Sequence, residues 1–157
     1  MRYQIPRQII VFCAAVVTVA AAFAAQAKPA SSIPSAALIQ PADLAAALKD
    51  AKAPRPLILQ VGFKVLFAEA HIAGAEYVGA AGQDEGIQAL RKRVAKLPKD
   101  VPIVLYCGCC PWTRCPNIAA AYDELHALGF TNVKVLYIAD NFGTDWVERG
   151  YPTDPVR

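Results

Sequence analysis

The segment Val101–Tyr106 constrains the fold more than any other part of the chain, because it is a nearly continuous apolar run, VPIVLY. A run of this kind, rich in β-branched residues, is typical of a strand buried on both faces in the middle of a parallel sheet. Neighbouring parallel strands are joined by crossover connections, which are usually helices. Apolar residues at helical spacing are found on both sides of the run: Ile87, Leu90, Val94 and Leu97 before it, and Ile118, Ala121, Tyr122, Leu125 and Leu128 after it.

Shorter segments extend the same pattern. Leu57–Val61 and Val133–Leu136 are predicted strands, and Ala75–Val78 is a weaker strand candidate. One helix is predicted to begin at Pro41, since proline suits the first turn of a helix, and a last helix is predicted over Asp140–Arg149. Strands and helices therefore alternate, which favours an α/β fold with a mostly parallel sheet and helices on both of its faces.

The N-terminus has the organisation of an export signal. Arg2 and Arg7 supply positive charge, the run Ile9–Ala25 has no charged residue, and Ala25-Gln26-Ala27 matches a small-x-small cleavage site. An uncleaved membrane anchor is the alternative, although the run is Ala-rich and shorter than the roughly 20 residues that span a bilayer. We therefore expect a periplasmic or secreted protein with a signal peptide over 1–27, a polar linker over 28–37 and one domain over 38–157.

The charge balance narrows the classes of partner. The formal net charge is +3, and without Arg2 and Arg7 the chain has fourteen basic against thirteen acidic residues, a net charge of +1. A nearly neutral domain offers no basic patch of the kind that binds nucleic acid. The expected partners are therefore small molecules or another protein, and neither nucleic acid nor, after signal cleavage, a membrane.

Four cysteines, Cys107, Cys109, Cys110 and Cys115, fall within nine residues. Cysteines that staple an exported protein join distant loops, so a cluster of this kind marks a site. In an open parallel sheet, ligands bind beyond the carboxyl ends of the strands, and the predicted central strand delivers Cys107 to that edge. A helix is predicted to begin near Pro116, and its N-terminus favours a thiolate over a thiol. Cys107 is therefore the candidate nucleophile.

Four short motifs resemble those of rhodanese-like domains and occur in the family's order. HIAGAEYV at 71–78 is similar to the motif before the third strand, and IVLYC at 103–107 resembles the strand that carries the catalytic cysteine. ALGFTNVKVL at 127–136 and WVERGYP at 146–152 are similar to the two motifs that follow. The resemblance implies a rhodanese-like α/β fold with a central, mostly parallel sheet of five strands. His71 is expected to hold its turn by hydrogen bonds.

The resemblance also implies sulfur chemistry. In the family, a loop cysteine attacks the sulfane sulfur of a donor such as thiosulfate, carries it as a persulfide, and passes it to an acceptor such as a thiol. By position, Cys107 is the nucleophile, Arg114 helps to bind an anionic donor, and the loop 108–114, which includes Gly108, forms the pocket. Trp112 either forms a wall of that pocket or anchors the loop by burial. No cofactor is expected. The expected partners are a small sulfur donor, a thiol acceptor or a redox protein.

The chain departs from the family pattern in three places. Six residues separate Cys107 from Arg114, two more than in the family, and Cys109 restores the familiar spacing. Gln60-Val61-Gly62-Phe63 stands where the family has Asp-x-Arg, and Asp140-Asn141-Phe142-Gly143 stands where it has Gly-Gly. Because a longer loop changes the radius of the pocket, thiosulfate need not be the donor.

Three other interpretations of the cysteine cluster stay open. Cys107 and Cys110 form a Cys-x-x-Cys pair between a strand and a helix, which is typical of thiol–disulfide exchange proteins, with Cys109 and Cys115 as supporting or further resolving thiols. All four thiols together suit a soft metal such as Cu(I) or Zn. Two disulfides within the loop would hold it shut without any chemistry.

Overall fold

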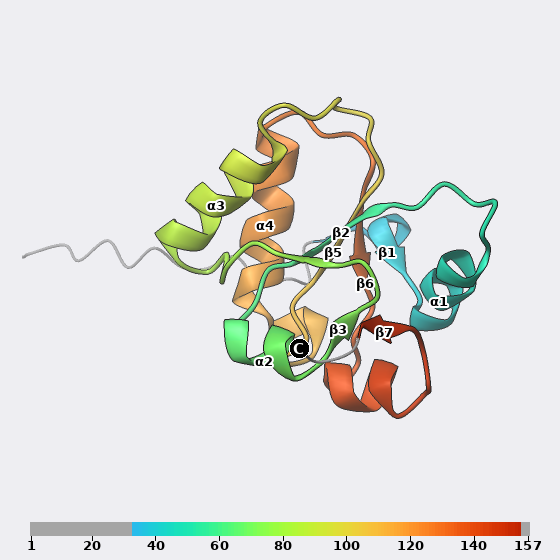
Figure 1. Cartoon of the computed structure of the whole chain (residues 1–157). Coiled ribbons are helices and arrows are strands. Elements are labelled where there is room, and N and C mark those ends of the chain that lie inside the picture. The colour runs from blue at the N-terminus through green and yellow to red at the C-terminus, as the bar shows by residue number, and fades with distance from the viewer. Residues whose placement is uncertain (1–32, 155–157) are drawn as a thin grey trace, which may run out of the picture.

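The computed structural model describes residues 33–154, which form a main sheet with helices on both faces and a separate two-stranded sheet (Figure 1). The main sheet contains five strands: β1 (Leu38–Ile39), β2 (Leu57–Gln60), β4 (Glu76–Tyr77), β5 (Ile103–Tyr106) and β6 (Val133–Leu136). Their order is β1-β6-β5-β2-β4, and every pairing is parallel. The predicted α/β class and the five-stranded sheet are therefore confirmed.

Strand β5 is the central strand that its apolar sequence predicts. It lies between β2 and β6, and all four of its residues are buried. Successive side chains enter opposite faces of the sheet, so that Ile103 and Leu105 pack in one core and Val104 and Tyr106 in the other. Because both faces are covered, the segment has no polar side, and its sequence shows no alternation.

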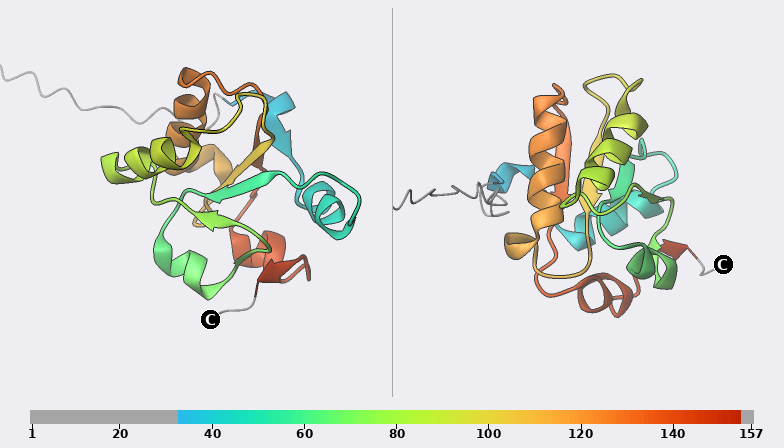
Figure 2. Two further views of the ribbon diagram at one scale, coloured as in Figure 1. Left: turned by 45° about the horizontal axis from the view of Figure 1, so that its top comes forward. Right: turned by 90° about the vertical axis from the view of Figure 1, so that its left-hand side faces the viewer.

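Helices α3 (Asp84–Val94) and α4 (Pro116–Ala127) cover one face of the sheet, and α1 (Pro41–Lys49) covers the other (Figures 1 and 2). The predicted helix starts at the two prolines are confirmed. Helix α4 ends before Gly129, whose φ of +85° suits glycine and disfavours other residues. This arrangement places the N-terminus of α4 at the carboxyl edge of the sheet.

The predicted last helix is shorter than expected and of a different kind. Instead of a helix over Asp140–Arg149, the structure has a π-helical turn, η4 (Gly143–Val147). The Asn141 side chain accepts the Thr144 N–H at 3.0 Å at the start of this turn, and the Glu148 N–H donates to Gly143 O, five residues before it, which is the π-helical spacing. Trp146 within η4 is fully buried on the α1 face of the sheet, as its expected inward position requires.

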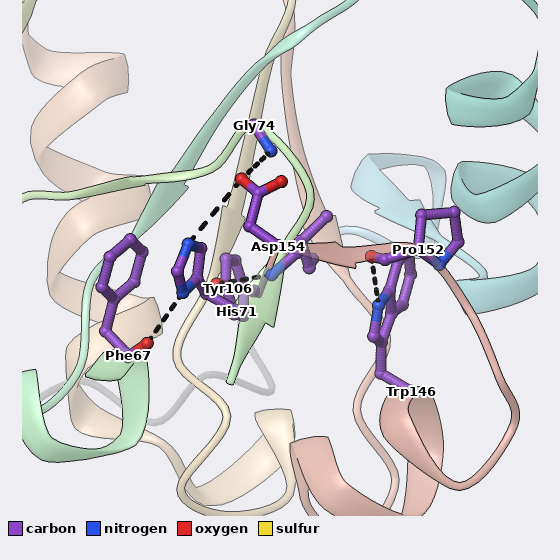
Figure 3. A network of polar contacts seen from close by, with 8 residues as sticks. Phe67, His71, Gly74, Tyr106, Trp146, Pro152 and Asp154 are labelled. Carbon is purple, nitrogen blue, oxygen red and sulfur yellow. Dashed lines mark hydrogen bonds and ion pairs between the residues drawn. The ribbon is translucent and has the colours of Figure 1, made fainter. Parts of the chain in front are cut away.

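Two short strands that the sequence analysis did not predict join distant parts of the domain. β3 (His71–Ile72) pairs antiparallel with β7 (Thr153–Asp154). Asp154 Oδ2 accepts the Gly74 N–H at 2.8 Å and lies 3.8 Å from His71 Nε2 (Figure 3). The chain after η4 is therefore fastened to the turn that follows β3.

The first and last family-like motifs supply this fastening. His71 Nδ1 donates to Phe67 O at 2.8 Å, and the two rings are stacked, which confirms a structural role for His71. Phe67 belongs to a further unpredicted helix, α2 (Lys64–Glu69). Trp146 Nε1 donates to Pro152 O at 3.0 Å (Figure 3). These motif residues thus stabilise the segments beside the sheet edge, and they are not themselves part of the cysteine loop.

The predicted signal peptide over 1–27 lies outside the described residues, as does the first part of the predicted linker over 28–37. The last part of that linker contains a 3-10 turn, η2 (Ser35–Ala37). Ile33 and Ala37 are buried in the core shared with α4, so the chain packs on the domain from Ile33 onward. Among the residues from 33 to 154, no helix is both long and apolar enough to cross a membrane.

Candidate active site

The cysteine loop leaves the carboxyl end of β5 and leads into α4. Cys107 directly follows β5, and Cys115 is the N-cap residue of α4, as expected from the proline after it. Between them lies a short 3-10 turn, η3 (Trp112–Arg114). The structure therefore confirms that Cys107 lies at the carboxyl edge of the sheet, close to a helix N-terminus.

The sulfur atoms of this loop form a compact cluster. Cys109 Sγ lies 3.2 Å from Cys107 Sγ and 3.2 Å from Cys110 Sγ. The sulfurs of Cys107, Cys109 and Cys115 all lie within 4.8 Å of one another. All four thiols are free, with Cys107 and Cys115 buried and the other two partly exposed. The sulfurs grouped with that of Cys107 are thus those of Cys109 and Cys115, and not that of Cys110, which the Cys-x-x-Cys spacing indicates.

Asn117, which the sequence analysis missed, completes the surroundings of Cys107. Its Nδ2 donates to Cys107 Sγ at 3.3 Å, and its Oδ1 accepts the Gly82 N–H at 2.7 Å. The second bond fixes the orientation of the amide, because only the oxygen can accept from a backbone N–H. Asn117 is buried in the first turn of α4, next to the predicted apolar stripe at Ile118. The sequence did contain a signal for Asn117 as a site residue: it is a polar residue beside that apolar stripe, two positions after the last cysteine.

Hydrogen bonds to the Cys107 sulfur hold the pKa of this thiol well below its ordinary value. The Cys109 thiol makes the largest contribution and the Cys115 thiol the next; the Cys109 backbone N–H and Asn117 also lower the pKa, while burial opposes them. The same bonds raise the pKa of Cys109 and of Cys115, because each must stay protonated to donate to Cys107. Among Cys107, Cys109 and Cys115, these hydrogen bonds therefore favour the thiolate at Cys107.

The other side of the cluster is formed by β2 and the residues after it. Gln60 is buried, and its Nε2 donates to Cys107 O at 3.0 Å while its Oε1 accepts the Gly62 N–H at 3.3 Å. A methyl carbon on Gly62 would lie 2.7 Å from Cys107 Sγ and 2.8 Å from Cys107 O, closer than such atoms approach. The residues that depart from the family pattern therefore accommodate Cys107: Gln60 bonds to its carbonyl, and Gly62 leaves room for its sulfur.

A cavity of about 430 Å³ opens beside the cluster. Its lining consists of Leu66, Glu69, Ala70, Gly108, Cys109, Asn141, Phe142, Gly143 and Val147. Among these described residues, Glu69 is the only charged one. Gly108, a predicted pocket residue, has a φ of +89° and packs against Phe142. Cys109 lines the cavity, whereas Cys107, which is 2% exposed, does not.

Two predicted site residues lie away from this cavity. Arg114 is exposed, and its guanidinium makes no hydrogen bond or ion pair with residues of the described range 33–154. The Trp112 ring packs against Tyr137, with ring centroids 6.0 Å apart, and the Trp112 backbone N–H donates to Ile138 O at 2.9 Å. Trp112 therefore anchors the loop to the segment after β6.

Comparisons with known proteins agree with this architecture. The family model for rhodanese-like domains matches residues 40–137. The solution structure of the rhodanese-like domain of an Anabaena sp. protein has 21% identity and a TM-score of 0.56, over 76% of this chain and 80% of that chain. A crystal structure of the same Anabaena protein has 20% identity and a TM-score of 0.57, over 75% of this chain and 92% of that chain.

A rhodanese-related protein from Thermoplasma volcanium has 22% identity and a TM-score of 0.53, over 76% of this chain and 98% of that chain. At these identities the likeness concerns the fold. Among curated proteins, no significant match was found.

Replacing Asn117 with alanine removes one donor from the Cys107 sulfur. Hydrogen bonds to charged groups contribute about 1.5–3 kcal/mol, so we expect the pKa of the Cys107 thiol to rise by about one to two units. Ultraviolet absorbance of the thiolate, followed against pH, measures this change. Asn132→Ala is the matched control, because Asn132 is exposed and its side chain contacts Asp100 O. An unchanged titration in Asn117→Ala would contradict the role assigned to Asn117.

Proposed function

This chain belongs to the family of rhodanese-like domains, and we propose that it acts as a sulfurtransferase or persulfide carrier in which the Cys107 thiolate accepts a sulfane sulfur. The observation that carries the proposal is the convergence of donors on the Cys107 sulfur: two thiols, a backbone N–H and the Asn117 amide. A sulfur anion is both the nucleophile and the product of such a transfer. Hydrogen-bond donors that already surround the Cys107 sulfur therefore stabilise the sulfur anion that the transfer uses.

The loading step forms one S–S bond and breaks another. The Cys107 thiolate attacks the outer sulfur of a hydropersulfide donor, and the donor's own sulfur leaves with the electron pair and the proton as a thiol. The negative charge then lies on the outer sulfur of the Cys107 persulfide. Helix α4 begins at Pro116, directly after this loop. Because a helix N-terminus favours negative charge, it also favours the charged persulfide.

The cavity supplies the route to Cys107, which is itself only 2% exposed. Cys109 both lines the cavity and contacts the Cys107 sulfur. A donor in the cavity therefore reaches Cys107 only after the Cys109 side chain turns aside. This is a rotation about a single side-chain torsion in a partly exposed residue.

The cavity lining favours a hydropersulfide, which accepts nucleophilic attack in its protonated, uncharged form, over thiosulfate, which stays a dianion. The charged residue in the lining is the carboxylate Glu69, and Arg114, which the family resemblance assigns to an anionic donor, lies outside it. A dianion placed in a mostly apolar cavity beside a carboxylate loses hydration without gaining a cation. The proposed donor is therefore the hydropersulfide of a small thiol.

Thiol–disulfide exchange is a second candidate function. The 3.2 Å contact between Cys107 Sγ and Cys109 Sγ favours it, since exchange requires a thiolate of low pKa beside a second thiol. The two functions differ in their products, because exchange leaves no additional sulfur on the protein.

We further propose that the protein is exported and acts in the periplasm or outside the cell, on the strength of the charge pattern and cleavage site of residues 1–27. Expression of the full chain in a bacterial host, followed by N-terminal sequencing of the periplasmic material, tests this proposal. The expected first residue is Lys28. A chain that retains Met1 in the membrane fraction would contradict cleavage.

Sulfur loading is tested in the Cys109→Ser variant, which keeps a hydrogen-bond donor beside Cys107 and removes the thiol in contact with it. After reduction and incubation with an uncharged alkyl hydropersulfide, intact mass spectrometry should show the gain of one sulfur atom, which cyanide removes. The double variant Cys107→Ser/Cys109→Ser should gain none. Thiosulfate should load Cys109→Ser more slowly than the hydropersulfide, because the cavity offers it no cation.

Uptake of sulfur by the double variant at the rate of Cys109→Ser would show that Cys107 is not the acceptor. If Cys109→Ser takes up no sulfur from either donor, the sulfurtransferase proposal is wrong, and thiol–disulfide exchange becomes the better explanation of the cluster.

A further inference from the structure

Three sulfur atoms run in sequence from the interior of the domain toward solvent. Cys107 is buried, Cys109 lines the cavity, and Cys110 is partly exposed. Cys109 Sγ lies 3.2 Å from each of the other two sulfurs. Sulfur transfer at Cys107 uses the Cys109 thiol only as a hydrogen-bond donor to the Cys107 sulfur, but a thiol at this distance can also react with that sulfur.

We propose that Cys109 resolves the persulfide formed on Cys107, so that the domain releases the accepted sulfur as hydrogen sulfide and is left with a Cys107–Cys109 disulfide. The inference rests on the proposed function, because it begins from the loaded persulfide. It adds a reductive activity, the conversion of sulfane sulfur to sulfide, to sulfur transfer.

The choice of Cys109 over the other two thiols follows from position. Both Cys109 and Cys115 donate to the Cys107 sulfur, but of the two it is Cys109 that lines the cavity through which a product can leave. Cys110 Sγ contacts Cys109 Sγ, and no hydrogen bond joins it to Cys107 within the described residues. Cys115 is 0% exposed at the start of α4, away from the cavity lining.

The resolving step balances within the protein. Cys109 attacks the inner sulfur of the persulfide, the Cys107 Sγ, and a Cys107–Cys109 bond forms. The bond between Cys107 and the outer sulfur breaks, and the outer sulfur leaves with the electron pair and the Cys109 proton as HS⁻. The sulfane sulfur gains two electrons, and the two cysteine sulfurs together lose two.

Loading itself removes the obstacle to this attack. Before loading, the hydrogen bond to the Cys107 thiolate is the largest cause that raises the pKa of Cys109. After loading, the Cys107 sulfur is bonded to a second sulfur, and the negative charge has moved outward. The Cys109 proton can then pass to the outer sulfur, which makes Cys109 the nucleophile and HS⁻ the leaving group.

The domain returns to its starting state when an external dithiol reduces the Cys107–Cys109 disulfide by thiol–disulfide exchange. Cys109 is the partly exposed member of this pair, so its sulfur is the one that the reductant attacks. The dithiol is oxidised to a disulfide, and both cysteines are recovered as thiols.

The test compares the full reduced protein with two single variants, Cys109→Ser and Cys110→Ser. Each is treated with one equivalent of the same alkyl hydropersulfide, without added thiol, and both the intact mass and the sulfide released are measured. Cys110→Ser is the matched control, because it makes the same chemical change one residue further along, at a thiol not in contact with Cys107. Sulfide released by Cys109→Ser, in which the resolving thiol is absent, gives the background.

The wild-type protein and Cys110→Ser should each release about one sulfide per domain and lose the mass of two hydrogen atoms. Cys109→Ser should retain one additional sulfur atom and release sulfide at least tenfold more slowly. If wild type and Cys109→Ser both retain the sulfur, the proposed function stands and the inference is wrong. Equal sulfide release from Cys109→Ser, or its loss in Cys110→Ser, would assign resolution to another thiol and also overturn the inference. If Cys109→Ser takes up no sulfur, the proposed function fails, and the inference fails with it.

Discussion

A sulfur anion in the interior of a protein needs hydrogen-bond donors around it, and the cysteine loop is arranged to supply them at Cys107. The Cys109 and Cys115 thiols and the Asn117 amide all point to that sulfur, while Gly62 leaves room on the opposite side. The fold makes this possible because β5 ends directly before Cys107, α4 begins directly after the loop, and β2 lies alongside. The fold thus contributes by placing three separate segments around one atom.

Much of the fold could be predicted because its main elements carry strong local signals. The apolar run before Cys107, the prolines at the starts of α1 and α4, and the apolar helical spacing all led to elements that the structure contains. The two-residue strands β3 and β7 could not be predicted, since they are defined by pairing across most of the chain. The helix expected over Asp140–Arg149 is replaced by the shorter turn Gly143–Val147, because apolar spacing in a sequence does not distinguish an α-helix from a single π-helical turn.

The candidate site could be predicted only where it depends on residues that are close together in the sequence. Cys107 at the end of β5 and Cys115 at the start of α4 follow from neighbouring residues. By contrast, the hydrogen bond from Gln60 to the Cys107 carbonyl joins residues 47 positions apart, and no sequence pattern predicts it. Arg114 and Trp112, which were expected beside the pocket, do not line this cavity, and the Trp112 ring packs against Tyr137. The loop is longer than in the family, so positions along it could not be carried over residue by residue.

The proposed chemistry depends on which cysteine of the cluster carries the negative charge, and the pH dependence of each cysteine measures this directly. Cysteine labelled with ¹³C at Cβ gives one chemical shift for each of the four thiols of the loop, and that shift differs between thiol and thiolate. At neutral pH, Cys107 should have the thiolate shift, while Cys109 and Cys115 keep thiol shifts and titrate only at alkaline pH, above the ordinary range of a cysteine. A thiolate found instead at Cys109, or no thiolate in the loop at neutral pH, would contradict the central claim.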